Sequence, residues 1–68
     1  MENYLEKCKK IGDIVRKYLN DGCVYSEEEN NTYQRIIFDL KHLTEENSFD
    51  TYQRWNILFK KHNINLNI

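Results

Sequence analysis

The chain contains no proline and no alanine, and its 68 residues include only two glycines, two cysteines and one tryptophan. Without proline and with so few glycines, the chain has no Pro- or Gly-rich linker. No apolar run is long enough to span a bilayer, and the polar N-terminal residues have no signal-peptide pattern. We therefore expect a cytoplasmic protein with no membrane segment, folded as one small domain with a thin core.

The missing residue types also indicate an origin. Asn, Lys, Ile and Tyr are abundant while Ala and Pro are absent, which is the effect that an AT-rich genome has on codon usage. The composition predicts a phage, a mobile element, a low-GC bacterium or a large DNA virus as the source. Sampling noise in so short a chain is the alternative explanation.

Charge of one sign is also lacking. Charged residues make up 31% of the chain, yet the formal net charge is only −1. Such a balance argues against a protein whose main task is to hold phosphates.

The two cysteines are not expected to form a disulfide. Cys8 falls within a predicted helix whose C-terminal end lies about 18 Å further along its axis, and Cys23 lies beyond that end. We therefore predict two free thiols in a reducing compartment.

One motif stands out among the residues that are present. The tetrapeptide Thr-Tyr-Gln-Arg occurs at residues 32–35 and again at residues 51–54. Counted from each Tyr, apolar residues follow at three, five and seven positions, and a Lys follows at eight. These equivalent pairs are Ile36 and Trp55, Phe38 and Ile57, Leu40 and Phe59, and Lys41 and Lys60. The spacing predicts two similar helices in similar surroundings.

Apolar periodicity predicts an all-α fold, a small three-helix bundle over residues 1–62 followed by a short C-terminal tail over residues 63–68. The predicted helices span residues 3–20, 26–43 and 49–62. The tail alternates Asn with apolar residues, which is a strand-like period.

Cap residues mark the predicted helix ends. Gly22 suits the left-handed conformation that closes the first helix. Ser26 and Glu29 have the spacing of a capping box at the start of the second helix. Ser48 or Asp50 is the predicted cap of the third helix.

Each predicted helix has an apolar stripe that should face the core. The stripe residues are Tyr4, Leu5, Cys8, Ile11, Ile14, Val15, Tyr18 and Leu19; Tyr33, Ile36, Ile37, Leu40 and Leu43; and Phe49, Tyr52, Trp55, Leu58 and Phe59. Gly12 falls on the buried side of the first helix, where it costs up to about 1 kcal/mol relative to Ala but lets another helix approach closely. Trp55 is expected to be buried.

Phe38 and Ile57 lie off the main stripes, each about 140° around its helix from the Tyr of its repeat. A helix that touches two neighbours needs a wide apolar face, so both side chains could belong to the core. The alternative is an exposed apolar patch, which usually marks a contact surface. The sequence leaves both interpretations open.

No catalytic or metal-binding pattern is found. The four candidate zinc ligands, Cys8, Cys23, His42 and His62, are scattered along the chain without the close spacing of a zinc site. Two glycines cannot build a glycine-rich phosphate loop. We therefore predict no catalytic residues, no metal, no cofactor and no enzymatic activity.

The first functional hypothesis is a small intracellular protein-binding module that acts as a regulator, inhibitor or adaptor. Aromatic residues make up 13% of the chain, and aromatic and Arg side chains dominate binding hot spots. The predicted partner-binding residues are Phe38, Ile57, Arg35 and Arg54. The partner is another protein of unknown identity or a second copy of the chain, since a thin core gains stability from an isologous contact.

The second hypothesis is a helix-turn-helix regulator that reads nucleic acid with the helix at residues 49–62. The predicted base-reading residues are Gln53, Arg54, Asn56, Lys60 and Lys61. Acidic residues in the connecting segment and the negative net charge argue against it, as does the apolar Ile57 on the reading face. Nucleic acid is therefore the less favoured partner.

Overall fold

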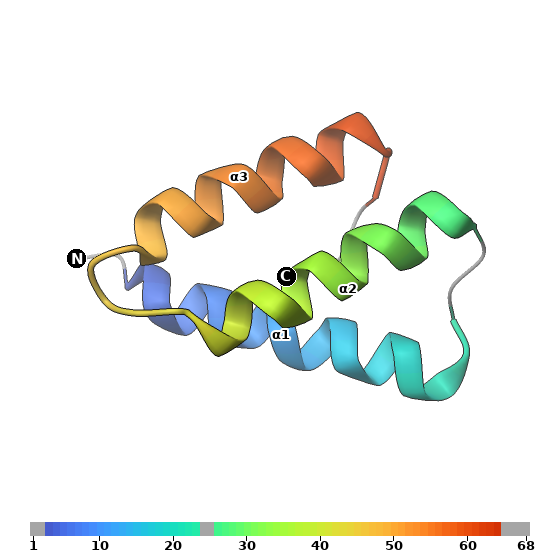
Figure 1. Cartoon of the computed structure of the whole chain (residues 1–68), viewed down its shortest axis with the longest axis horizontal. Coiled ribbons are helices and arrows are strands. Elements are labelled where there is room, and N and C mark those ends of the chain that lie inside the picture. Colours follow the sequence, from blue (N-terminus) through green and yellow to red (C-terminus); the bar gives the residue numbers. More distant parts are fainter. Residues whose placement is uncertain (1–2, 24–25, 65–68) are drawn as a thin grey trace.

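The computed structural model describes residues 3–23 and 26–64, and this part of the chain forms a three-helix bundle (Figure 1). The helices are α1 (Tyr4–Asp21), α2 (Glu27–Lys41) and α3 (Ser48–Lys61). α1 and α3 run in the same direction, and α2 runs antiparallel to both. The predicted all-α fold is confirmed, and α2 ends two residues earlier than predicted.

The predicted cap of α1 is present, and the Ser26 half of the predicted capping box of α2 is present. Gly22 has a φ of 71° and its N–H donates to the carbonyl of Tyr18, so it closes α1 in the left-handed conformation. The Cys23 N–H donates to the same carbonyl at 2.8 Å. At the start of α2, the Ser26 hydroxyl accepts the N–H of Glu29 at 3.0 Å. These local signals fix the ends of the connection between the two helices.

The predicted cap of α3 is wrong, because the N-cap residue is Asn47 and not Ser48 or Asp50. Asn47 organises the preceding connection instead: its side chain accepts the N–H of Thr44 at 2.8 Å and donates to the carbonyl of His42 at 2.9 Å. These loop hydrogen bonds are not visible in the residues of the helix start alone, and with them α3 begins one residue earlier than predicted.

α3 ends in a motif that the sequence did not predict. Asn63 adopts a φ of 58°, and the Ile64 N–H donates to the carbonyl of Phe59 at 2.8 Å. This is the hydrogen bond of a Schellman cap, with Asn in place of the usual Gly. The cap turns the Ile64 side chain back onto the core. The rest of the predicted tail lies outside the described residues.

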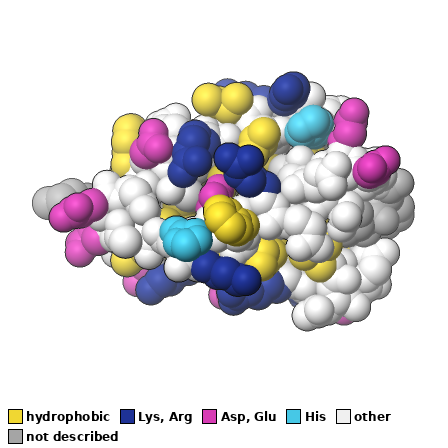
Figure 2. Space-filling view, viewed as in Figure 1, with side chains coloured by type: hydrophobic (Ala, Val, Ile, Leu, Met, Phe, Trp, Pro, Cys, Tyr) yellow, Lys and Arg dark blue, Asp and Glu magenta, His cyan; other side chains and the backbone are white. Residues whose placement is uncertain are grey.

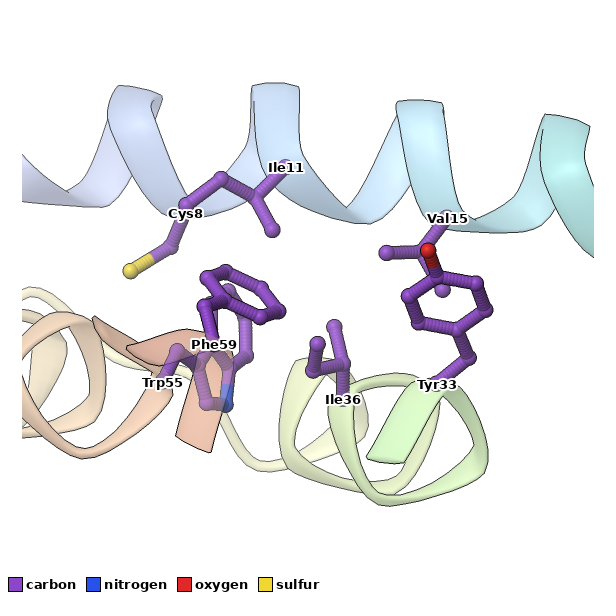
Figure 3. Close-up of a cluster of buried hydrophobic side chains, with 7 residues drawn as sticks. All are labelled: Cys8, Ile11, Val15, Tyr33, Ile36, Trp55 and Phe59. Carbon is purple, nitrogen blue, oxygen red and sulfur yellow. The ribbon is translucent and has the colours of Figure 1, made fainter. Parts of the chain in front are cut away.

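Seven side chains from all three helices form the buried core (Figure 3). They are Cys8, Ile11 and Val15 of α1, Tyr33 and Ile36 of α2, and Trp55 and Phe59 of α3. Trp55 has no exposed surface, so its predicted burial is confirmed. Phe49 was predicted to face inward, but it is 52% exposed. It lies in the first turn of α3, at the rim of the bundle, where its ring and that of Tyr4 form a T-shaped pair with centroids 4.8 Å apart.

Gly12 is buried on α1 and faces α2, as its position in the apolar stripe predicts. A Cβ atom at this position would overlap the side chain of Leu40, whose Cδ1 is the nearest atom and whose Cδ2 would be 2.9 Å away. The missing side chain therefore provides the space into which Leu40 packs. This close approach explains why a glycine is tolerated within the helix despite its cost in backbone entropy.

Gly12→Val is expected to lower the free energy of unfolding by about 1–3 kcal/mol, because the added methyl groups overpack the contact with Leu40. Urea titrations followed by circular dichroism measure the effect. The double variant Gly12→Val with Leu40→Ala should recover part of the loss, because the smaller side chain vacates the space. A Gly12→Val variant as stable as the parent would contradict the close contact.

Candidate functional site between helices α2 and α3

α1 packs against both other helices, whereas α2 and α3 contact each other least. A groove with a cavity volume of about 450 Å³ lies between α2 and α3. It is lined by Glu28, Asn31, Thr32, Arg35 and Asp39 of α2, by Arg54 and Leu58 of α3, and by His62. The groove therefore brings together both arginines of the repeated tetrapeptide.

The groove has a hydrogen-bonded link between its walls. The indole N–H of Trp55 donates to Asp39 Oδ2 at 2.9 Å, and the side chain of Asp39 is only 13% exposed. The other carboxylate oxygen of Asp39 lies 4.0 Å from Nε of Arg35. Asp39 thus provides the acceptor that a buried indole N–H requires. Because the two residues lie on different helices, the bond links α2 to α3 beside the groove.

Asp39→Ala is expected to lower the free energy of unfolding by about 1–3 kcal/mol, because it leaves the buried N–H of Trp55 without an acceptor. Asp50→Ala is the matched control: it also removes an Arg partner four residues away, but Asp50 is 77% exposed. Its loss should cost no more than about 1 kcal/mol. Equal losses in urea denaturation would show that the Trp55 bond contributes nothing.

The α3 side of the groove has further polar contacts. Arg54 Nε lies 3.3 Å from Asp50 Oδ2, and its Nη2 donates to the Thr51 hydroxyl at 3.3 Å. At the far end, His62 Nδ1 lies 3.5 Å from a carboxylate oxygen of Glu28. The guanidinium of Arg54 is held in the groove while nearly half of its side chain stays exposed.

Phe38 and Ile57 are exposed on either side of the groove. Their exposed fractions are 59% and 65%, so of the two open interpretations the structure favours the apolar patch over the core. Each follows its groove arginine by three positions, which places it about 60° further around the helix, toward the outer surface. Figure 2 shows hydrophobic, cationic and acidic side chains intermixed at the centre of this face. We call this surface, with Phe38, Ile57, Arg35 and Arg54, the α2–α3 face.

The equivalent positions of the repeat have similar surroundings, as its spacing predicts. Thr32 and Thr51 are both buried, and Ile36 and Trp55 are both fully buried. Phe38 and Ile57 are both exposed. The two helices therefore turn equivalent sides toward α1 and equivalent sides toward solvent, although they run in opposite directions along the bundle.

The structure gathers the predicted partner-binding residues but divides the predicted nucleic-acid-binding set. On α3, Gln53, Asn56 and Lys60 fall on one side and Arg54 and Lys61 on another, with Ile57 between them. The Asn56 side chain also donates to the carbonyl of Tyr52 at 3.0 Å. In addition, α2 and α3 lie antiparallel (Figure 1), whereas a helix-turn-helix joins its helices at about 90–120°.

The polar residues of the groove that were not predicted as site residues include Glu28, Asn31, Asp39 and His62. A charged residue directly between the apolar Phe38 and Leu40 was the available signal for Asp39. Its partner Trp55 is 16 residues away on another helix. No local pattern identifies such a pair, because it depends on how the helices pack.

Neither thiol lines the groove between α2 and α3. Both cysteines are free, and burial raises the pKa of Cys8 from 9.0 to about 11. Its thiol donates to the carbonyl of Ser48 at 3.5 Å. Burial, followed by the nearby Glu29, raises the pKa of Tyr33 to about 12. No group of three metal-ligating side chains gathers within residues 3–23 and 26–64, the described part of the chain.

Cys8 should resist thiol reagents at pH 8 in the folded protein, whereas the half-buried Cys23 should react. Because the folded-state pKa of Cys8 lies above that of the unfolded chain, its contribution to stability is intact below pH 9 and declines between pH 9 and about 11. Urea midpoints measured across this range should fall, and Cys8→Ala should fall less. A rapid reaction of both thiols at pH 8 would contradict the buried position.

Comparisons with protein-family models, curated proteins and solved structures find no match for this chain. The case for a function therefore depends on the geometry of the chain itself. None of the three described helices combines the length and the apolar character that a membrane crossing requires.

Proposed function

We propose that the protein is a small, non-enzymatic, intracellular protein-binding module and that it binds through the α2–α3 face. The observation that carries the proposal is the exposure of Phe38 and Ile57 beside a groove lined by Arg35 and Arg54. Exposed apolar side chains grouped with arginines are typical of contact surfaces. A regulator, an inhibitor and an adaptor all act in this way.

Three further features support the proposal. The groove is a preformed recess beside the two exposed apolar side chains, so a partner can insert a side chain between helices that already have fixed positions. Arg35 and Arg54 are 63% and 48% exposed, which leaves donor groups available for a partner. The two free thiols suit a reducing, intracellular compartment.

Site-specific photo-cross-linking tests the proposal. A benzophenone amino acid is placed at position 38 or 57, and at the exposed Lys10 of α1 as the matched control. Each protein is irradiated alone and in extract of the source cell, and the adducts are identified by mass spectrometry. Positions 38 and 57 should both form an adduct with the same defined protein, and position 10 should form none.

Two results would overturn the proposal. Positions 38 and 57 that form no adduct in either setting would mean that the face binds no protein. Adducts formed only at position 10 would move the interaction to the basic side of α1.

A DNA-binding measurement tests the alternative function. We expect no binding of mixed-sequence duplex DNA at physiological salt. Tight binding that weakens as salt rises would favour a nucleic-acid reader instead.

A further inference from the structure

The two helices of the α2–α3 face carry opposite net charges. α2 has four carboxylates and two cationic side chains, whereas α3 has one carboxylate and three cationic side chains. The charges concentrate at one end: Glu27, Glu28 and Glu29 lie in the first turn of α2, and Lys60 and Lys61 in the last turn of α3. Of these, Glu28 lines the groove and Lys61 lies on the same side of α3 as Arg54. Because the helices are antiparallel, the acidic start of α2 and the basic end of α3 lie at the same end of the bundle (Figure 1).

The apolar residues of the face are arranged in a matching way. Phe38 on α2 and Ile57 on α3 occupy equivalent repeat positions and flank the groove from its two sides. The side of the molecule seen in Figure 2 extends 34 by 22 Å between Cα atoms. The area enclosed by these two lengths is of the same order as the roughly 800 Å² that each partner contributes to an interface of standard size.

From these observations we propose that the partner bound by the α2–α3 face is a second copy of this chain, with α2 of each copy lying antiparallel over α3 of the other. The inference rests on the proposed function and names its partner. The two-fold axis lies between the two copies and runs parallel to the groove. Rotation about it exchanges the α2 side and the α3 side of the face, while each helix keeps its direction along the bundle. It therefore places Phe38 of each copy against Ile57 of the other, and each acidic α2 start over a basic α3 end.

Charge complementarity is what favours a second copy over an unrelated protein. An unrelated partner would need its own basic and acidic groups, side by side and in matching positions. A second copy carries both by its sequence. The two-fold rotation places its basic α3 end over the acidic α2 start of the first copy, and its acidic α2 start over the basic α3 end of the first copy. The net charge of −1 adds little repulsion between the copies.

Exchanging the charges tests this arrangement. The variants Glu27→Lys with Glu28→Lys, and Lys60→Glu with Lys61→Glu, each place like charges across the dimer, so each alone should dimerise at least about tenfold more weakly than the parent. Mixed in equal amounts, they should recover the parent affinity, because Lys then faces Glu in both of the contacts between an α2 start and an α3 end. Sedimentation equilibrium measures each dissociation constant, and circular dichroism verifies that each variant is folded.

Apolar variants keep the test decisive if a charge variant fails to fold. Phe38→Asp with Ile57→Asp should retain the helical spectrum and lose the dimer, since both side chains are exposed in the single copy. Phe49→Asp is the matched control, because Phe49 is exposed to a similar degree but packs on Tyr4 away from the groove. It should dimerise as the parent does.

The outcomes separate this inference from the proposed function. A parent chain that remains monomeric up to about 1 mM overturns the dimer, as does a dimer that survives the change at Phe38 and Ile57. Mixed charge variants that fail to recover overturn the placement of α2 over α3. If the pure chain is monomeric while positions 38 and 57 cross-link to one other defined protein, the proposed function stands and this inference fails. If these positions cross-link to nothing, both fail.

Discussion

Trp55→Ala is expected to unfold most of the protein at 25 °C. Removing a fully buried Trp from a core costs about 3–5 kcal/mol, and a chain of this length has a total stability of only about 3–10 kcal/mol. Two losses combine at this site: the large cavity among residues of all three helices, and the hydrogen bond to Asp39 across the groove. Far-UV circular dichroism should show a large loss of helix.

Trp55→Phe serves as the control for this variant. Phe keeps part of the ring volume but has no N–H group, so it should remain folded and lose less stability than the alanine variant. In the parent, the emission of the single tryptophan should be blue-shifted and should move to the red on unfolding. A Trp55→Ala protein that unfolds cooperatively at nearly the parent urea concentration would show that Trp55 does not anchor the core.

Ile36→Ala is expected to lower the free energy of unfolding by about 2–5 kcal/mol, because it opens a cavity where α2 meets the other helices. Phe38→Ala, two residues further along the same helix, is the matched control. Phe38 is exposed, so removing its larger side chain should cost less than about 1 kcal/mol. Urea unfolding of both variants gives the comparison. A larger loss at position 38 would place Phe38 in the core and withdraw it from the binding face.

Most of the fold can be predicted from the sequence because its signals are local. The stripe of α1, the left-handed Gly22 and the Ser26 cap all depend on residues within four positions of one another. Phe49 was misplaced because periodicity identifies one side of a helix without showing whether a neighbour extends far enough to cover it. Asn63 was missed as a cap because Gly is the usual residue in that conformation.

Less of the candidate site could be predicted, because it depends on packing between helices. The sequence singled out Phe38 and Ile57 but left open whether they are buried or exposed. That question depends on the angle at which α2 and α3 rest on α1, and no pattern within one helix gives that angle. The bond between Asp39 and Trp55 also arises only after the helices have packed, although each residue alone is visible in the sequence.

Gly12 also has a consequence for how the chain selects a single topology. Two helices with nearly the same sequence pattern can compete for the same position on α1, and a bundle with α2 and α3 exchanged would bury a similar set of residues. The recess at Gly12 accepts Leu40 of α2. The equivalent residue of α3 is the bulkier Phe59, which we expect to fit this recess less well than Leu40 does. A single missing side chain should therefore disfavour the exchanged bundle and help each of the two similar helices to take its own place.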